Sequence, residues 1–340
     1  MAGDRITLCP TKGRTVKVGV VGCGHLGGIH ARVWSEIPEA ELVGIYDIDA
    51  ARAAEVAGRL GCKAWDSLDE LARTAEALSV CVPTPAHRDV ALSALDAGCH
   101  LLVEKPLAAT TGEGEEILGR AESRGLRVMV GHVERFNPAM IAALPYLKKP
   151  GFVESTRIAP FVGRGSDVPV VTDLMIHDID LLCMLLGDEP ETLDAAGIPV
   201  LTPDVDIANV RLRFAGGCVA NLTASRISLK RERKIRFFQS DSYLAVDLME
   251  GRVSRAAKGP GFEAAVMRAL GDPTSLSSLR MEELILEDSI EVKKAEPLRL
   301  ELEAFHRALA GGGTMPVSGE DGLRALRVAE RILSQVAARG

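Results

Sequence analysis

The 340-residue sequence has no excess of positive charge and no long apolar run. Its net charge of −7 argues against nucleic acid as a main partner, which would favour a basic patch. No apolar run reaches the roughly 18 residues that are needed to span a bilayer. The first 15 residues lack the apolar core of a signal peptide and are interpreted as a loose extension. We therefore expect a cytoplasmic protein without membrane insertion.

The sequence also lacks paired cysteines, because its seven cysteines are odd in number, scattered and without a C-x-x-C motif. This pattern predicts reduced, mostly buried thiols and excludes a disulfide framework or a zinc site, so no metal ligand is assigned. What the chain does have is a hydrophobic content of 47% and a charged content of 26%, which are typical of a globular protein. Its length exceeds what one core usually spans and predicts two domains.

A glycine loop begins the folded part. Residues 16–30 read VKVGVVGCGHLGGIH, an apolar run followed by a G-x-G-x-x-G turn and a helical pattern. Strand, glycine turn and helix in this order predict a dinucleotide-binding unit. Gly22 permits the tight turn, Gly24 lets the backbone approach a pyrophosphate, and Gly27 lets helix and strand pack closely. His25 and Leu26 lie at the helix start, whose free N–H groups face the phosphates.

Asp47 ends the next apolar run, 20 residues after Gly27. An acid there accepts hydrogen bonds from the adenosine ribose and repels a 2′-phosphate. The following Ile48 and Asp49 offer no arginine for that phosphate, so the sequence favours NAD over NADP. The alternative interpretation is that Asp47 only caps the next helix.

Short apolar runs alternate with helical patterns between residues 16 and 130. The runs are VKVGVV, ELVGIY, ALSVCV, HLLVE and RVMVG, with helical stretches such as 49–60, 86–97 and 111–124 between them. Nearly continuous apolar strands separated by helices predict a parallel sheet that is covered on both faces. This is a doubly wound α/β domain of the Rossmann type.

Several polar residues follow the ends of these strands. Carboxyl ends of parallel strands line the ligand crevice, so Thr84 and His87 are expected to border the cofactor. A turn marked by proline, with His87 in the first helical turn, is an equally good explanation of that histidine. Glu104 ends the run HLLVE and Lys105 follows it, and both are expected to border the cofactor as well. Pro106 biases Lys105 toward an extended backbone at the crevice.

The second half of the chain has a different hydrophobic pattern. Residues 131–150 are the expected domain crossing, and from Phe152 onward longer alternating runs predict an open, mainly antiparallel sheet with hairpin turns at 216–217 and 241–242. We predict an extension at 1–15, an NAD-binding Rossmann domain at 16–131, and an α+β domain for substrate binding and oligomerisation at 132–340. Open sheets often pair across subunits, so a homodimer or homotetramer is expected.

Three further segments are given structural interpretations and no catalytic or binding role. The basic run 230–234 admits a phosphate site, but charge runs commonly mark exposed edges, and a solvated strand end is the better interpretation. Residues 252–283 contain Gly, Pro and Ser and predict a long loop with a helix near 263–270. The patterns at 297–310 and 319–338 predict packing helices.

Residues 171–187 read VTDLMIHDIDLLCMLLG and predict a buried helix, because no Lys, Arg or Glu occurs from Asp173 to Leu186. Asp173, His177 and Asp180 recur at i, i+4 and i+7, which places them on one helical stripe. A buried helix must satisfy such groups or line a cleft with them. The residues alone also allow Asp173 as a helix cap and His177 as a satisfied core histidine.

The glycine loop, the T-P-x-H segment and Glu-Lys-Pro together resemble the Gfo/Idh/MocA oxidoreductases, from residue 16 to nearly the end of the chain. In that family the lysine of Glu-Lys-Pro touches the substrate hydroxyl and the nicotinamide, and a D-x-x-x-H motif lies on the helix of the second half. The resemblance implies Lys105, Asp173 and His177 as catalytic residues of an NAD-dependent alcohol oxidation. His177 would take the hydroxyl proton, Lys105 would hold the oxygen, and Asp173 would orient the histidine.

The stretches VGHVERFNPA and APFVGR resemble the subgroup that oxidises the 3-hydroxyl of UDP-N-acetylglucosamine, so that a partner aminotransferase can install an amine for lipid A. This resemblance implies a sugar or nucleotide-sugar substrate held by the catalytic residues. We also expect substrate contacts by Arg135, by Asp180 because it shares the helical stripe, and by Arg164 as a candidate anion contact in the loop 159–164. On the sequence alone Arg164 is equally well explained as a surface arginine. Two alternatives stay open: a dehydrogenase of a free polyol or sugar such as inositol, and a non-catalytic NAD-binding sensor.

Overall fold

The computed structural model describes residues 14–161, 168–271 and 284–338. These residues form two compact units, and each unit combines separate stretches of the chain. The first holds the described residues up to Phe136, Val171–Glu189 and the residues from Ala295 onward, while the second holds Asn137–Val170 and Pro190–Lys294. The expected division at residue 131 lies near the first crossing. It differs from the structure in one respect: Val171–Glu189 and the C-terminal helices group with the first unit.

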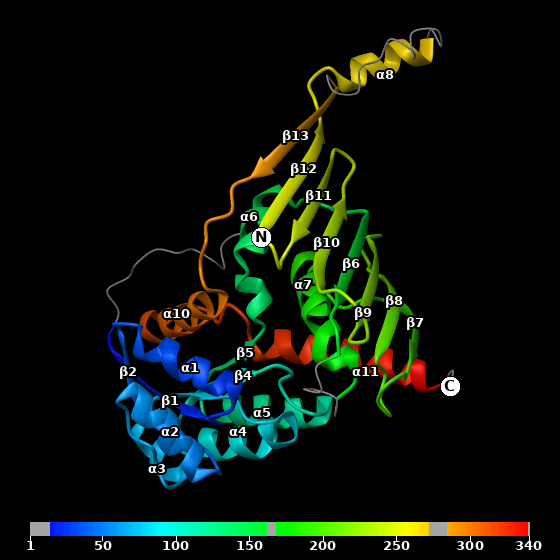
Figure 1. The fold of residues 1–340 in the computed structure, drawn as a ribbon. Coiled ribbons are helices and arrows are strands. Elements are labelled where there is room, and N and C mark those ends of the chain that lie inside the picture. Colours follow the sequence, from blue (N-terminus) through cyan, green and yellow to red (C-terminus); the bar gives the residue numbers. More distant parts are fainter. Residues whose placement is uncertain (1–13, 162–167, 272–283, 339–340) are drawn as a thin grey trace. The chain divides into compact units, whose positions relative to one another are not determined.

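The first unit is built on a five-stranded parallel sheet with the order β2-β1-β3-β4-β5 (Figure 1). Its strands are β1 (Val16–Val21), β2 (Ala40–Tyr46), β3 (Ala77–Val80), β4 (His100–Glu104) and β5 (Val128–Gly131). All four strand pairings are parallel. β3 and β5 are buried along their whole length, which is why they read as continuous apolar runs. The predicted doubly wound sheet is confirmed.

Helices cover both faces of this sheet, with α1 and α10 side by side on one face and α4 and α5 on the other (Figure 1). The helices of the unit are α1 (His25–Ser35), α2 (Ala50–Leu60), α3 (Leu68–Thr74), α4 (His87–Asp96), α5 (Thr111–Ser123), α7 (Ile176–Leu186), α10 (Pro297–Gly311) and α11 (Gly319–Ala337), with short turns η2 (Thr84–Ala86), η3 (Val133–Phe136) and η5 (Val171–Met175). Their starts follow capping chemistry. Asp49, Ser67 and Thr110 each accept a backbone N–H of the helix that follows them.

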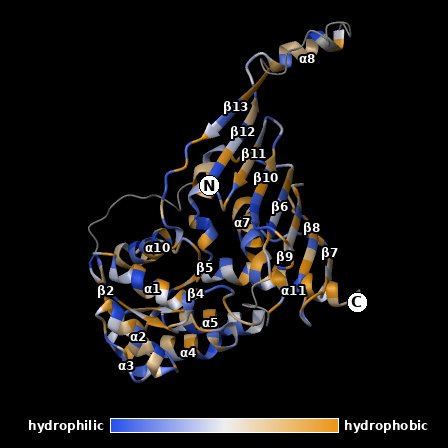
Figure 2. Cartoon of the chain, viewed as in Figure 1, coloured by the Kyte–Doolittle hydropathy of each residue, from blue (hydrophilic) through white to orange (hydrophobic). Residues whose placement is uncertain are grey.

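Helix α7 is buried as its composition predicts, and Figure 2 shows it mainly in the colour of apolar residues. One feature of this segment was not expected: Val171–Met175 forms a π-helical turn before the α-helix begins at Ile176. A π turn takes more residues per turn than an α-helix and is frequent at functional sites. Asp173 therefore does not share a regular α-helical stripe with His177 and Asp180.

The second unit contains an eight-stranded sheet with the order β13-β12-β11-β10-β6-β9-β8-β7. The strands are β6 (Phe152–Ile158), β7 (Thr192–Ile198), β8 (Ile207–Arg213), β9 (Val219–Ser225), β10 (Glu232–Phe238), β11 (Ser242–Asp247), β12 (Arg252–Lys258) and β13 (Ile285–Ile290). Only the β6–β9 pairing is parallel among those described, so the predicted open, mainly antiparallel sheet is confirmed. The unit also contains α6 (Pro138–Ala143), η4 (Leu144–Tyr146) and α8 (Phe262–Gly271).

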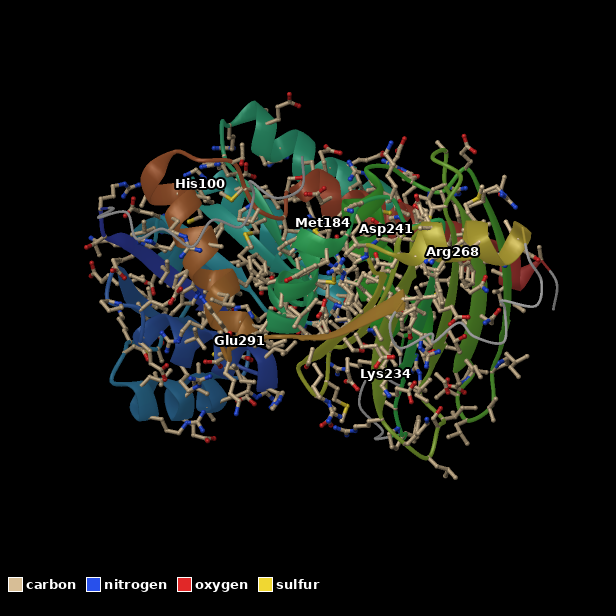
Figure 3. The ribbon with its side chains drawn as sticks, turned by 90° about the horizontal axis from the view of Figure 1, so that it is seen from above. His100, Met184, Lys234, Asp241, Arg268 and Glu291 are labelled. Carbon is tan, nitrogen blue, oxygen red and sulfur yellow. The ribbon has the colours of Figure 1, made fainter. Side chains whose placement is uncertain are left out.

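Predictions for the second unit are partly corrected. The loop expected from residue 252 is wrong over Arg252–Lys258, which forms β12, whereas the helix near 263–270 is present as α8. The hairpin turns fall between β8 and β9 and between β10 and β11, and Gly217 takes a φ of 84° that favours glycine. Lys230 and Arg231 are exposed just before β10, and Lys234 lies on that strand (Figure 3), so the basic run is a solvated strand end.

Among the described residues, no helix is long and apolar enough to cross a membrane. The six cysteines of the same residues are all free thiols. Cys9 lies outside the described residues.

Candidate active site

The glycine loop between β1 and α1 has the shape of a phosphate cradle. Gly22 takes a φ of +91°, and a Cβ on Gly27 would lie 1.7 Å from the Gly22 carbonyl oxygen, so both positions require glycine. A Cβ on Gly24 would meet nothing within 4 Å, which leaves the loop open on that side. Gly24, His25 and Leu26 are exposed at the start of α1, and no side chain caps that end. The free N–H groups therefore suit the pyrophosphate of NAD.

Asp47, directly after β2, holds this loop by hydrogen bonds. It is buried, and its Oδ2 accepts the Cys23 N–H at 2.6 Å while Oδ1 accepts the Asp49 N–H at 2.9 Å. The sequence interpretation overlooked Arg52, whose guanidinium lies 3.5 Å from Asp47 Oδ1. Its position in the first turn of α2 was the available signal, since that turn starts beside the end of β2.

A pocket of about 620 Å³ adjoins the loop, within the size range of ligand sites. Residues of the glycine loop, α1 and α2 line it: Cys23, Gly24, His25, Gly28, Ile29, Arg32, Arg52, Glu55, Val56, Arg59 and Leu60. Burial, together with the Asp47 charge, raises the pKa of the Cys23 thiol to about 12, so this cysteine is a neutral wall residue.

Thr84 and His87 follow β3. Thr84 begins the turn η2 and is partly exposed. The buried His87 ring faces two backbone carbonyls, with Nδ1 2.8 Å from Pro106 O and Nε2 2.9 Å from Val82 O. Burial lowers the pKa of His87, so the ring is neutral and donates to one of the two. His87 thus ties the strand ends together, and a contact of Thr84 or His87 with the cofactor stays a prediction.

Lys105 and Asp173, 68 residues apart in the chain, meet in the first unit. Lys105 Nζ donates to the Asp173 carbonyl oxygen at 2.7 Å and lies 3.2 Å from its carboxylate Oδ1. Both side chains keep some exposure, 16% for Lys105 and 30% for Asp173. The structure thus presents an ammonium and a carboxylate together at the carboxyl end of β4, open to a ligand.

Glu104, the last residue of β4, supports Lys105 from the buried side. Its Oε1 lies 2.9 Å from His30 Nε2, and its Oε2 accepts the Lys105 backbone N–H at 3.2 Å. Burial alone would raise the pKa of Glu104, but the hydrogen bond from His30 and the charge of Lys105 hold it below its usual value. Glu104 is therefore ionised and belongs to the support of the site.

His177, in the first turn of α7, is partly buried beside a second histidine that sequence reasoning missed. The rings of His132 and His177 meet edge to face, with centroids 6.5 Å apart. His132 is buried, and its Nε2 lies 3.9 Å from Asp180 Oδ1. Burial lowers the pKa of His132, so it stays neutral beside His177. The available signal was its place directly after β5, at the same sheet edge as Lys105.

Arg135 and Asp180 are brought together deep in the unit. Arg135 Nη2 and Nε donate to the two carboxylate oxygens of Asp180 at 2.5 and 2.7 Å, and Asp321 lies 3.4 Å from Arg135 Nη1. Both residues of the pair are at most 2% exposed. The geometry makes them each other's partners, and a substrate contact by either stays a prediction. Arg164 lies outside the described residues.

Within the described ranges, no group of three or more His, Cys, Asp or Glu side chains is placed to hold a metal ion.

Comparisons with known proteins show the family of the chain. A family model described as "Oxidoreductase family, NAD-binding Rossmann fold" (Gfo/Idh/MocA) matches residues 16–132, and the "GFO/IDH/MocA C-terminal domain" matches residues 162–245. UDP-N-acetylglucosamine 3-dehydrogenase of Acidithiobacillus ferrooxidans is 34% identical over 93% of this chain and 96% of its own. A solved structure of that enzyme matches with a TM-score of 0.85 at 33% identity, over 95% of this chain and 98% of its own.

Inositol 2-dehydrogenase of Rhizobium meliloti is 27% identical over 95% of this chain and 97% of its own. These relatives extend the match through both units. The chain therefore belongs to the Gfo/Idh/MocA family of oxidoreductases with an NAD-binding Rossmann fold.

Proposed function

We propose that this chain is an NAD-dependent dehydrogenase that oxidises the 3-hydroxyl of UDP-N-acetylglucosamine. The observation that carries the reaction is the contact of the Lys105 ammonium with Asp173 at the end of β4. His177 follows Asp173 by four residues, in the first turn of α7. The support for the substrate is the 34% identity with the dehydrogenase of that nucleotide sugar over nearly the whole chain.

Each side chain has a distinct part in this proposal. The Lys105 ammonium holds the substrate oxygen by a charge-assisted hydrogen bond and favours the alkoxide-like transition state. His177 takes the hydroxyl proton as the general base. Asp173 fixes Lys105, because its carbonyl oxygen and carboxylate both face the ammonium. NAD, when bound at the glycine loop, supplies the acceptor for the hydride that leaves the same carbon.

The reaction is tested by NADH absorbance with UDP-N-acetylglucosamine and NAD. Lys105→Met and His177→Asn are expected to fold and bind NAD but to lose at least about a hundredfold in kcat, as loss of a positioned acid–base group does. A folded Lys105→Met protein with full turnover would contradict the role of the lysine.

Screening myo-inositol in the same assay separates the second substrate class, which the 27% identity with inositol 2-dehydrogenase supports. Turnover of inositol without turnover of the nucleotide sugar would replace the proposed substrate. If NAD binds and neither substrate changes its absorbance, even with a second carbonyl acceptor present, the sensor interpretation replaces the enzyme.

The wider setting is also part of the proposal. We infer a homo-oligomer formed through the eight-stranded sheet, because β8 alternates buried Ala208, Val210 and Leu212 with exposed residues that leave one polar face for a partner. Sedimentation of the purified chain tests it, and a monomer at micromolar concentration would contradict it. A cytoplasmic location suits the free thiols, and a 3-keto nucleotide sugar suits consumption by an aminotransferase for lipid A.

A further inference from the structure

Glu301, in the middle of α10, is a buried carboxyl group that the reaction described above does not use. It is 0% exposed, and among the residues that the structure describes no hydrogen-bond donor reaches either of its oxygens. An ionised carboxylate without donors is very costly away from water, so the group takes a proton instead. Burial, with the charges of Glu104 and Asp180, raises the pKa of Glu301 well above its usual value. Glu301 is therefore a neutral carboxylic acid with an O–H group that needs an acceptor.

His30, on α1, has a ring nitrogen that lacks a hydrogen-bond donor. Its Nε2 is 2.9 Å from the Glu104 carboxylate, while its Nδ1 is buried and has no partner within the described part of the chain. Because Glu104 is ionised and only accepts, His30 Nε2 carries the hydrogen and Nδ1 is left as an acceptor. A buried acceptor without a donor costs stability, so Nδ1 requires an O–H or N–H group.

The packing of the two helices places His30 and Glu301 on facing sides. Trp34 on α1 and Phe305 on α10 meet edge to face, with ring centroids 6.4 Å apart. His30 lies four residues before Trp34 and Glu301 four residues before Phe305, so each shares the facing side of its helix with one of these rings. Figure 1 shows α1 and α10 lying side by side over the sheet.

We propose that the Glu301 O–H group donates to His30 Nδ1 through one bound water, and so fixes His30 as the donor to Glu104. The resulting chain from Glu301 through His30 to Glu104 carries one negative charge, held on Glu104 directly before Lys105. Glu301 and His30 are positioning residues: they act on the substrate only through Glu104 and Lys105. This inference rests on the proposed role of Lys105 in the dehydrogenase reaction.

The consequence concerns the charge beside Lys105. If Glu301 cannot donate, His30 Nδ1 is left as a buried acceptor without a donor, and the ring is held less firmly as the donor to Glu104. The anionic form of Glu104 is then less stabilised, which weakens the negative charge directly before Lys105. The titratable and charged groups that face this chain from neighbouring elements are Cys81, Lys105, His132, Arg135 and Asp180.

The first test does not depend on turnover. Infrared difference spectra between the wild type and Glu301→Gln at pH 7, without substrate, are expected to show the C=O band of one protonated carboxylic acid in the wild type, shifted in D₂O. Glu303→Gln is the matched control, since Glu303 lies on the same helix in a partly exposed ion pair with Arg307. It is expected to leave the band in place. Absence of a band that Glu301→Gln removes would overturn the proposal, whether or not the enzyme acts on the proposed sugar.

The second test is the pH profile of kcat. Glu301→Leu is expected to move the alkaline limb lower, by up to about one pH unit, because the negative charge directly before Lys105 is weakened. Glu301→Gln is expected to restore the wild-type limb, because its amide N–H₂ can donate to Nδ1. An unshifted limb in a folded Glu301→Leu protein would overturn the positioning role. If Glu301→Leu does not fold, a shifted limb in Glu301→Gln would overturn it.

Discussion

The buried pair of Arg135 and Asp180 makes a sharp prediction for stability. Two charge-assisted hydrogen bonds of 2.5 and 2.7 Å join them, and both side chains are at most 2% exposed. Removing one partner of such a pair costs about 3–5 kcal/mol, because the other charge stays buried. Asp321 still lies 3.4 Å from Arg135, and an Asn keeps one acceptor, so Asp180→Asn is expected near the lower end, about 3 kcal/mol.

Urea unfolding followed by tryptophan fluorescence measures this value for the right part of the molecule. The chain has two tryptophans, Trp34 and Trp65, and both belong to the first unit, as the ion pair does. Asp96→Asn is the matched control, since Asp96 pairs with Arg120 and Arg124 at 44% exposure, where solvent screens the pair, and its loss is expected to cost far less. Equal costs for the two variants would refute the reasoning. Partial recovery of stability in an Asp180→Leu, Arg135→Met double variant would support it.

Three further results are expected. Gly24→Ala should fold like the wild type, because a Cβ there meets nothing within 4 Å, but it should raise the KM for NAD at least about tenfold. The control variant, Gly58→Ala on α2, should leave the KM unchanged. Equal KM values for the two variants would mean that the loop does not approach the cofactor. The pKa of Glu301 is raised in the folded state, so the wild type should lose stability as pH rises above the pKa of the unfolded carboxyl group. The free energy of unfolding of Glu301→Gln should therefore gain about 1.4 kcal/mol over that of the wild type for each pH unit above that pKa. A difference that does not change with pH would contradict a protonated Glu301. Burial alone would raise the pKa of Asp206, but three backbone N–H groups and a hydroxyl lower it. The stability that the Asp206 carboxylate contributes is therefore present above the unfolded pKa and is lost as pH falls. In an acid titration followed by circular dichroism, Asp206→Asn should lose less stability than the wild type.

The fold was largely predictable because its signals are local. Apolar runs and capping residues gave the parallel sheet and the helices of the first unit. β12 was missed because Arg252–Lys258 contains a single large apolar residue, Val253, and reads like a loop. Its strand form comes from pairing with β11, a long-range contact that composition does not encode.

The residues of the site could be predicted where a sequence motif marks them. They could not be predicted where only their burial in the fold makes them notable. Lys105 and His177 stand in short patterns that a resemblance can carry. His132 and Glu301 are single polar residues in apolar surroundings. Only the structure shows that His132 meets the ring of His177 and that Glu301 feels the charge of Glu104. The π turn at Val171–Met175 was equally hidden, because its sequence fits an ordinary α-helix. That turn removes Asp173 from the predicted stripe.

The most direct test of the central claim is NADH formation from NAD and UDP-N-acetylglucosamine by the wild type and by Lys105→Met. The account predicts turnover by the wild type, with a 3-keto sugar as product, and at least about a hundredfold less by a Lys105→Met protein that still binds NAD. Equal turnover by the two proteins, or no oxidation of any sugar by a wild type that binds NAD, would contradict it.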